Sequence, residues 1–544
     1  MAEPDENDAT RTARAVVVAL LGAGVREVVV APGSRNAPLS FAVWDAAAAG
    51  LLRLHTRIDE RSAAFLALGL SRTGAPAAVV STSGTAVANL HPAVLEAAHA
   101  GVPLVVVTAD RPARLSGTGA NQTTEQVGVF GPLVATRDVG ADRPPGWLAL
   151  WLEDGPVHLN VRLDEPLLPA GPWVLDADER EAATGADPQE RLGSRWPTTD
   201  APIDPGPRTV VVAGDDAGPP PRLLAQAAGW PLLAEPSSGS RTGSHALRAY
   251  RLLLETDLGR SIERVVVAGH PTLSRPVTRL LGRDGVEVLA APARGVWAAR
   301  PFAVDVELPG AAPHPDQQAT DPGWLAAWVE ADRAVSRRLD ALLGAEPGLT
   351  PYDVAGAVAR ALPPEGLLHV GASSPIRDLD LMVHGWQVGA RRKVVANRGL
   401  SGIDGVVSTA IGAALGRPSS SRAFALVGDV TFLHDANGLV LGPDEPEPDL
   451  TIVVVNDDGG SIFSMLEQGA PAHADRFERL FATPHRVDLA SLCAATRTPH
   501  WRVESLPELE QALASPNGGI EVVEARVRRD DRRALDERIR ALRP

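Results

Sequence analysis

The sequence has few of the residues on which several classes of protein depend. Its 544 residues include one cysteine, Cys493, so an intrachain disulfide and a cysteine metal cluster are both excluded. Aromatic residues make up only 4% of the chain. Basic residues are outnumbered 67 to 52 by acidic ones, which gives a formal net charge of -15. Because no basic block is present, neither nucleic acid nor an anionic membrane is expected as a partner.

Several sequence motifs are also missing. No run of about 18 uncharged apolar residues occurs, which predicts a chain without a transmembrane helix. The N-terminus reads MAEPDENDAT and has no apolar signal segment, so we expect a cytoplasmic protein. Neither GxxxxGK[ST] nor a GxGxxG after a strand is present, which disfavours nucleotide and dinucleotide sites. The histidines form no HExxH motif or close pair that would indicate zinc.

The order of apolar segments predicts an α/β fold with three doubly wound, parallel-sheet domains. Short runs rich in Val, Ile and Leu alternate with helical segments, as in sheets that are buried on both faces. The predicted strands are 28–31, 77–82 and 103–109, then 209–213, 264–268 and 286–290, then 367–371, 393–396, 423–427 and 450–455. A polar stretch rich in Pro and Gly at 176–206 reads as a surface linker, and a second at 304–320 marks the end of the middle unit, followed by a helical connector. We therefore place domains at 1–185, 186–345 and 346–544.

Three helices in the last domain have recognisable signals. Thr350 is a plausible N-cap with Pro351 at the first helical position, which predicts a helix from there. A further helix is expected at 405–415. In the terminal segment 528–543, opposite charges three and four residues apart predict a solvated amphipathic helix.

Carboxylates follow two predicted strands of the last domain. Asp429 comes directly after the strand 423–427 and its glycine, and Asn456, Asp457 and Asp458 follow the strand 450–455. In parallel sheets, ligands bind beyond the carboxyl ends of the strands. Two carboxylates about 4 Å apart repel by about 4 kcal/mol at an effective dielectric near 20, unless a cation lies between them. The pattern therefore favours magnesium and a phosphorylated cofactor, although either turn alone is explained by the turn preference of Asp and Asn.

Arginines also gather near the ends of predicted strands. Arg35, Arg111, Arg377 and Arg398 all lie in loops within a few residues of a strand end. The planar guanidinium group matches a carboxylate, so two or three anionic groups on the substrate are expected. Each arginine taken singly is better explained as a surface ion pair.

These motifs resemble the thiamine diphosphate-dependent enzymes. The pair GD and NDDGG, separated by 26 residues, looks like the diphosphate and magnesium motif of that family, and RIDERSAAFLALGLSR is similar to the segment that supplies its glutamate, here Glu60. Further matches are APGSRNAPL, TSGTAVANLHPAV, ADRP, GTGANQ, NRGLSGIDGVVSTAIGAALG and NDDGGSIF. Together they are similar to the branch of the family that acts in menaquinone biosynthesis. The middle domain resembles that branch mainly through its order, its length and the segment PTLSRP.

The resemblance implies how the cofactor is bound. The first domain would hold the aminopyrimidine through Glu60, and the last domain would hold the diphosphate across a subunit interface, in a homodimer or a dimer of dimers (homotetramer). The implied ligands of Mg²⁺ (or Mn²⁺) are Asp429, Asp457 and the carbonyl of Gly459, with Asn456 as an alternative to Asp457. Gly428, Ile403, Ile462 and Phe463 would complete the cofactor site. The residue after Asp429 is Val430, where the wider family commonly has glycine.

The resemblance also implies a reaction, the decarboxylation of 2-oxoglutarate and the addition of the succinyl unit to isochorismate. Arg377 and Arg398, with Ser373 or Ser374, would hold the succinyl carboxylate. The implied isochorismate site consists of Ser34, Arg35, Arg111, Asn121, Gln122 and Arg275. Within this set Arg35, Asn121 and Gln122 are expected to be catalytic together with Glu60.

Two other functions remain open at this point. An acetohydroxyacid synthase-like carboligase would turn over pyruvate and hold a flavin in the middle domain. A non-catalytic regulatory protein would have retained only the fold, against which the intact Glu60 and Asp429 argue. The sequence leaves undecided the choice between dimer and tetramer, the metal used in the cell, feedback by a downstream naphthoate or quinone product, and the role of the middle domain.

Overall fold

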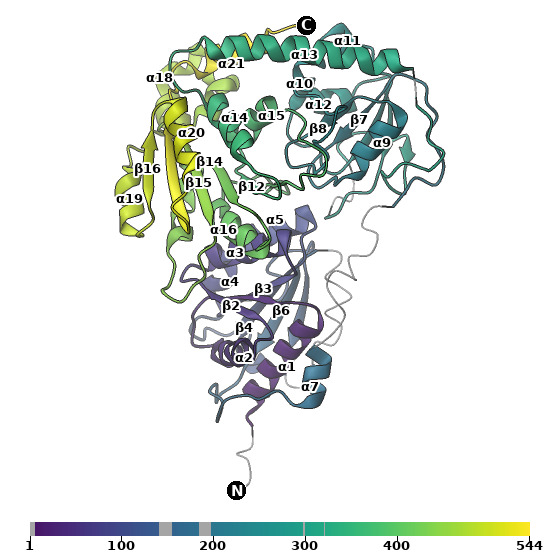
Figure 1. Ribbon diagram of the computed structural model, residues 1–544. Helices are drawn as coiled ribbons and strands as arrows, with labels where there is room; N and C mark the ends of the chain where they lie inside the picture. Colours follow the sequence, from purple (N-terminus) through teal and green to yellow (C-terminus); the bar gives the residue numbers. More distant parts are fainter. Residues whose placement is uncertain (1–5, 141–154, 184–196, 297–299, 320) are drawn as a thin grey trace.

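The computed structural model describes residues 6–140, 155–183, 197–296, 300–319 and 321–544, which form three α/β units (Figure 1). The first unit contains one sheet of order β2-β1-β3-β4-β6-β5, in which all paired strands are parallel. Its strands are β1 (Glu27–Val30), β2 (Arg53–Thr56), β3 (Ala77–Ser81), β4 (Leu104–Asp110), β5 (Ala135–Val139) and β6 (Val157–Arg162). Alternating strands and helices with parallel pairing confirm the predicted α/β class.

The last unit repeats the topology of the first. Its sheet has the order β13-β12-β14-β15-β17-β16, so its strands, numbered within the unit, follow the same order as those of the first. They are β12 (Leu367–Val370), β13 (Lys393–Val395), β14 (Ala423–Gly428), β15 (Leu450–Asn456), β16 (His500–Val503) and β17 (Ile520–Arg526). In both sheets the order reverses between the first and third strands. A crevice at such a reversal is the usual ligand site of open parallel sheets.

The middle unit has a smaller parallel sheet of order β11-β10-β9-β7-β8. Its strands are β7 (Thr209–Ala213), β8 (Leu232–Ala234), β9 (Arg264–Ala268), β10 (Glu287–Ala290) and β11 (Val306–Glu307). The predicted strands of all three units agree with the observed ones to within one or two residues, because each is an apolar run that is buried on both faces. The boundary placed between 185 and 186 lies outside the described residues, and the one between 345 and 346 stays a prediction.

The first and last units are joined by two helices that pack closely. Helix α3 (Glu60–Thr73) lies against α16 (Val406–Gly416), and side chains of both belong to one hydrophobic core (Figure 1). A Cβ atom added to Gly69 would lie 2.2 Å from the carbonyl oxygen of Thr409. Only glycine permits this approach of the two backbones, so the α3 and α16 contact fixes how the two units are oriented.

The linker and helix predictions for the domain borders have mixed outcomes. Thr350 caps α14 (Pro351–Ala361) in a capping box with Asp353, which confirms the predicted helix start. The expected linker at 176–206 contains a helix, α7 (Ala177–Ala183), and Ala183 packs into the core of the first unit. Burial of apolar side chains thus orders part of a segment whose composition suggested a linker.

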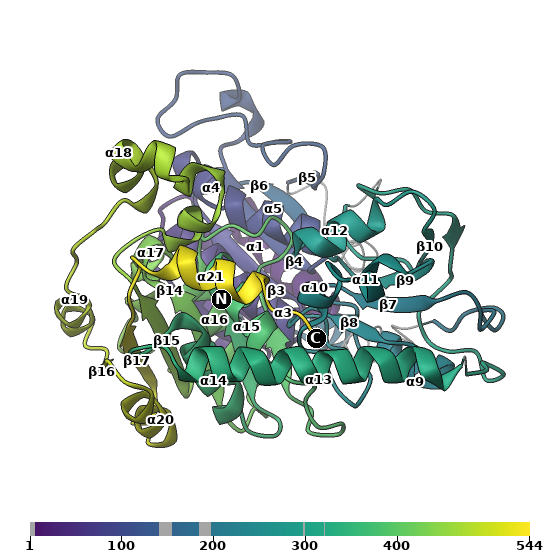
Figure 2. The same ribbon diagram turned by 90° about the horizontal axis from the view of Figure 1, so that it is seen from above.

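The C-terminal segment differs from its prediction as a solvated helix. Helix α21 (Arg532–Arg540) buries one face, including Leu535 and Ile539, and lies beside α13 (Pro322–Gly344) (Figures 1 and 2). Arg532 is fully buried and forms an ion pair with Asp378. The prediction was wrong for this face because a charged residue reads as exposed in sequence, whereas here a buried carboxylate neutralises it.

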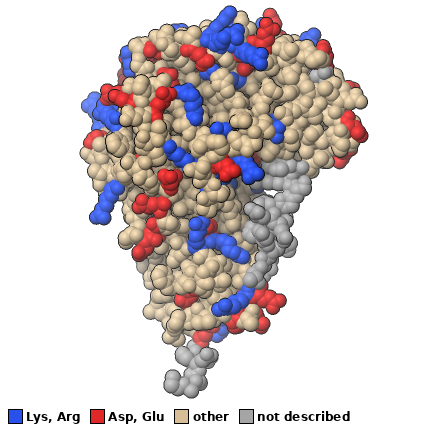
Figure 3. All heavy atoms as spheres, in the orientation of Figure 1, with Lys and Arg blue, Asp and Glu red and all other residues tan. Residues whose placement is uncertain are grey.

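The surface mixes charges of both signs. Acidic and basic side chains alternate over the face seen in the orientation of Figure 1, without a continuous basic patch there (Figure 3). Over the described ranges, which omit 1–5, 141–154, 184–196, 297–299 and 320, no helix combines the length and the apolar character needed to cross a membrane.

Candidate active site

The crevice at the strand reversal of the last sheet contains most of the predicted cofactor residues. Asp429 begins α17 (Asp429–His434) directly after β14, Asp457 follows β15, and Ser374 begins α15 (Ser374–Met382) after β12. These loops enclose a cavity of about 120 Å³. Among the residues that line it are Ser373, Ser374, Ile403, Gly428, Asp429, Asp457, Gly459, Ile462 and Phe463. The structure therefore brings these nine predicted residues together at one site.

Two buried carboxyl groups face this cavity. Asp429 is 2% exposed, and its Oδ2 accepts a hydrogen bond from the amide of Gly459 at 2.9 Å and lies 3.1 Å from Nε2 of His485. Burial raises the pKa of Asp429, whereas these partners oppose the increase. Burial, and after it the charge of Asp429, raise the pKa of Asp457. A divalent cation bound between the two would remove this mutual destabilisation, so the donor chemistry fits magnesium.

Asn456, the alternative metal ligand, is already fully used in the fold. Its Nδ2 donates to Oε1 of Glu524 at 2.7 Å, and its Oδ1 accepts from the amide of Asp458 at 3.0 Å. Asn456 is completely buried and does not line the cavity that contains Asp429 and Asp457. We call this cavity the diphosphate cavity, after the ligand group expected there. This geometry favours Asp457 over Asn456 as the candidate metal ligand.

Gly459 has a backbone conformation and surroundings that favour glycine. Its φ is +147°, and a Cβ atom at this position would lie 2.3 Å from the carbonyl oxygen of Ala482. A side chain is therefore excluded, and the amide of Gly459 is free to donate to Asp429.

The cavity also contains polar side chains that the sequence analysis did not assign. These are Asp378, Thr431, Ser461 and Arg532. Ser461 belongs to the NDDGGSIF motif, which was a usable signal for it. No sequence signal pointed to Arg532, because it lies on the C-terminal helix, far along the chain from the other residues. His485, which lies beside Asp429, likewise comes from a loop without a motif.

Glu60 lies in the first unit and not among the residues of the last unit described above. Asp59 caps helix α3 by accepting from the amide of Arg61 at 2.9 Å, so that Glu60 is the first helical residue. Oε2 of Glu60 accepts from Nδ2 of Asn89 at 3.3 Å, and the side chain is partly exposed. The described residues that line the diphosphate cavity include Asp429 but no residue of the first unit.

The predicted acceptor residues of the first unit form one polar cluster at its strand ends. Nη1 of Arg111 donates to Oγ of Ser83 at 2.8 Å, and Nη2 donates to the carbonyl of Asn121 at 2.7 Å. Nε2 of Gln122 donates to the carbonyl of the same serine at 2.9 Å. Nη1 of Arg35 donates to the carbonyl of Leu163 at 3.2 Å, and burial, followed by the charge of Arg111, lowers the pKa of Arg35. Ser34, adjacent in the loop, is exposed.

Arg275 lies in the middle unit, apart from the polar cluster of the first unit. It starts α12 (Arg275–Leu281), forms an exposed ion pair with Glu467 at 2.9 Å, and lines a cavity of about 610 Å³ together with Arg377. This second cavity shares Asp378, Ile462 and Arg532 with the diphosphate cavity, so the two adjoin.

Of the predicted donor-binding arginines, Arg398 lies in a loop after β13, whereas Arg377 lies in helix α15 and not in a loop as predicted. Nη1 of Arg377 donates to the carbonyl of Ser373 at 2.6 Å. Burial and then the charge of Arg398 lower the pKa of Arg377. Arg398 itself is 3% exposed, and its Nη2 donates to Oγ1 of Thr272 at 2.8 Å. Its Nε and Nη1 have no hydrogen-bond partner in the described part of the chain, which leaves two buried donors for an anionic ligand.

Comparisons with known proteins match two separate parts of the chain, one in the first unit and one mainly in the last. Residues 10–129 match the thiamine pyrophosphate enzyme N-terminal TPP binding domain, and residues 380–523 match the C-terminal TPP binding domain. Three similar curated proteins, all called 2-succinyl-5-enolpyruvyl-6-hydroxy-3-cyclohexene-1-carboxylate synthase, come from Nocardioides sp., Kineococcus radiotolerans and Mycobacterium marinum. They are 69%, 46% and 42% identical, over 100%, 98% and 98% of this chain and 99%, 99% and 100% of their own lengths. The chain therefore belongs to the 2-succinyl-5-enolpyruvyl-6-hydroxy-3-cyclohexene-1-carboxylate synthases, a family of thiamine diphosphate-dependent enzymes.

Proposed function

We propose that this enzyme decarboxylates 2-oxoglutarate and adds the succinyl unit to isochorismate in menaquinone biosynthesis. The products are 2-succinyl-5-enolpyruvyl-6-hydroxy-3-cyclohexene-1-carboxylate and CO₂. The observation that supports this most strongly is full-length similarity, at 69% identity, to a relative named for that product. The arginines near two separate strand ends agree with two anionic substrates.

Each group of residues has a distinct part in this reaction. When bound, thiamine diphosphate supplies the electron sink that loss of CO₂ requires. Glu60 holds and moves a proton at the aminopyrimidine. Arg377 and Arg398 orient the distal carboxylate of the donor, while Arg35 and Arg111, with Asn121 and Gln122, orient the acceptor.

We infer that Asp429, Asp457 and the carbonyl of Gly459 hold Mg²⁺ or Mn²⁺, with diphosphate oxygens completing the set. Among the described residues no group of three or more His, Cys, Asp and Glu is arranged to hold a metal ion. Two carboxylates with a carbonyl and phosphate oxygens are the donor set that Mg²⁺ commonly takes beside a phosphorylated ligand.

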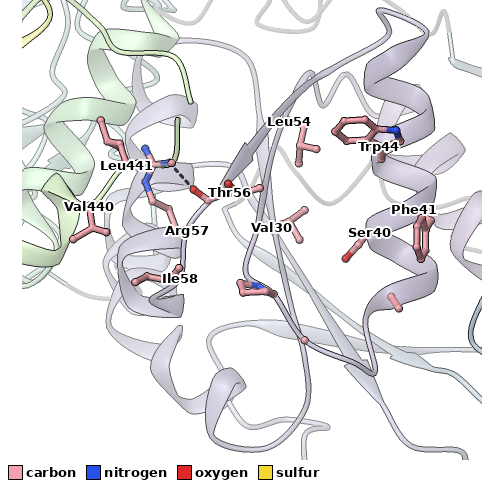
Figure 4. A pocket seen from close by; sticks show the side chains of 14 residues that line it. Val30, Ser40, Phe41, Trp44, Leu54, Thr56, Arg57, Ile58, Val440 and Leu441 are labelled. Carbon is pink, nitrogen blue, oxygen red and sulfur yellow. Dashed lines mark hydrogen bonds between the residues drawn. The ribbon is translucent and has the colours of Figure 1, made fainter. Parts of the chain in front are cut away.

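We further propose a homodimer, or a dimer of dimers, in which Glu60 of each chain faces the diphosphate cavity of its partner. The support is an exposed apolar surface near Glu60. Trp44 is 62% exposed and Ile58 72%, and both line an apolar cavity of about 710 Å³ with Phe41 and Val440 (Figure 4). An exposed apolar patch of this kind commonly marks a protein interface. A cytoplasmic location is proposed as well, in agreement with the single cysteine.

The dimer is tested by mixing two inactive variants. Coexpressed Glu60→Gln and Asp429→Ala chains form hybrid dimers in which one of the two sites combines an intact Glu60 with an intact Asp429. With random pairing, activity returns to about a quarter of the wild-type value. Separately tagged chains allow the hybrid to be purified and assayed. Hybrids as inactive as either parent would show that both residues act within one chain.

Replacing Arg398 with Ala is expected to impair use of the donor substrate. Loss of a charge-assisted contact worth about 1.5 to 3 kcal/mol raises KM for 2-oxoglutarate by about ten- to a hundredfold. Arg111→Ala is the matched variant, for which KM for isochorismate increases instead. Steady-state kinetics with each substrate varied in turn measures both, and unchanged donor kinetics in Arg398→Ala would exclude that role.

The reaction itself is tested with purified protein, thiamine diphosphate, Mg²⁺, 2-oxoglutarate and isochorismate. We expect loss of the ultraviolet absorbance of isochorismate that depends on every other component. If the cofactor binds and isochorismate is stable, the acceptor is wrong. Turnover of pyruvate together with a flavin absorbance spectrum would instead indicate the acetohydroxyacid synthase-like alternative.

A further inference from the structure

The middle unit places a buried carboxyl group at the loop that Arg398 also contacts. Glu235 follows β8 and is 1% exposed, and its Oε1 accepts from the amide of Leu273 at 2.9 Å. Its Oε2 has no hydrogen-bond partner in the described ranges, and neither do Nε and Nη1 of Arg398. Arg398 donates to Thr272, the residue next to Leu273, so both side chains end at the same short loop between β9 and α12.

The other charged groups around Glu235 are already paired. Asp380 accepts from Arg241 at 2.8 Å and from the Tyr250 hydroxyl at 2.9 Å, and Asp215 accepts from Arg72 at 2.7 Å. The remaining charged neighbours are the guanidinium groups of Arg398 and Arg377. Unlike Asp380 and Asp215, Glu235 has no ion pair, although its Oε2 and two nitrogens of Arg398 are buried without hydrogen-bond partners in the described ranges.

Glu235 is neutral over most of the physiological range. Burial raises its pKa to about 8, although the charge of Arg398 opposes this. Below that pH the positive charge of Arg398 has no internal counter-charge from this residue. Above it, ionised Glu235 supplies one.

We propose that Glu235 is a positioning residue that acts through Arg398, leaving its guanidinium to the donor's distal carboxylate when neutral and competing with that carboxylate when ionised. This inference rests on the proposed function, because it takes 2-oxoglutarate as the ligand of Arg398. It also gives the middle unit a role in donor binding. The contact runs through Glu235, Thr272 and Leu273, all of which belong to that unit.

The sign of the pH dependence follows from this competition. A carboxylate bound at Arg398 favours neutral Glu235, so donor affinity is complete below pH 8 and is lost as Glu235 ionises above it. For one proton, KM for 2-oxoglutarate increases about tenfold between pH 7 and pH 9. KM for isochorismate lacks this increase, because its proposed ligands Arg35 and Arg111 lie in the first unit, and Arg275, although in the middle unit, is exposed and paired with Glu467.

The test compares Glu235→Gln with wild type across pH 7 to 9. Glutamine still accepts from the amide of Leu273 but cannot ionise, so KM for 2-oxoglutarate becomes independent of pH. Glu255→Gln is the matched control, since Glu255 lines the adjoining cavity, is exposed and pairs with Arg279. This control retains the wild-type increase in KM.

Three results of this comparison would contradict a proposal, and they separate the role of Glu235 from the function of the enzyme. A KM for 2-oxoglutarate that increases in Glu235→Gln as in wild type overturns the role of Glu235. A wild-type KM without the increase overturns it too, even if the variant does not fold. Absence of any turnover of 2-oxoglutarate by the wild-type enzyme at every pH would instead contradict the proposed function.

Discussion

Replacing Glu60 with Gln lowers kcat by about 10²- to 10⁴-fold. The change removes the carboxylate that moves a proton at the cofactor, and general acid–base catalysis contributes an effect of this size. Glutamine preserves the length of the side chain, and its Oε1 accepts from Asn89 as Glu60 does, so the start of α3 is retained. The measurement is kcat for isochorismate consumption at saturating cofactor.

Asp59→Asn is the matched control for this variant. It removes the charge of the neighbouring carboxyl group, while an amide oxygen still accepts from the amide of Arg61. We expect kcat of this control to stay within about threefold of wild type, because the substitution keeps the cap of α3 and leaves the Glu60 carboxylate in place. Circular dichroism shows whether both proteins are folded. A Glu60→Gln enzyme with wild-type kcat would remove Glu60 from the mechanism.

Replacing Asp429 with Ala weakens magnesium-dependent binding of thiamine diphosphate by about a hundredfold or more. Loss of supporting partners around a metal already costs ten- to a hundredfold, and this side chain is proposed to contact the ion directly. Its removal also leaves the amide of Gly459 and the ring of His485 without their acceptor. Isothermal titration of the cofactor with and without Mg²⁺ measures the change.

Asp458→Asn provides the comparison, since Asp458 is in the same loop but does not line the diphosphate cavity. Its φ of +60° is one that asparagine tolerates, so the loop is retained. We expect its cofactor affinity to match wild type. Equal affinities of Asp429→Ala and Asp458→Asn would mean that the metal lies elsewhere.

Features that depend on neighbouring residues could be predicted well. The strands are short apolar runs, Thr350 and Pro351 mark a helix start, and Asp429 and Asp457 directly follow strands. Parallel sheets bring the carboxyl ends of their strands to one edge, so these positions converge without detailed knowledge of packing. The α/β class was therefore accessible from the chain alone, and so was the convergence of Asp429 and Asp457 at one cavity.

Pairings between distant segments could not be predicted. The sequence left Asn456 open as an alternative to Asp457, and the hydrogen bonds of Asn456 to Glu524 on β17 and to the amide of Asp458 show that it is used in the fold. Arg532 reads as a surface charge until α21 packs it against Asp378. The residue spacing of such partners follows no period, because it depends on how whole domains pack.

The sequence by itself determined the family, the three parallel sheets and the residues at their strand ends, since local pattern and strand order suffice for these. The tertiary structure alone decided which polar groups are buried without partners. Glu235 and Arg398 acquire their shared environment only when the middle and last units meet around Thr272 and Leu273. Burial changes the charge that such groups hold, and burial is a property of the packed molecule rather than of any segment.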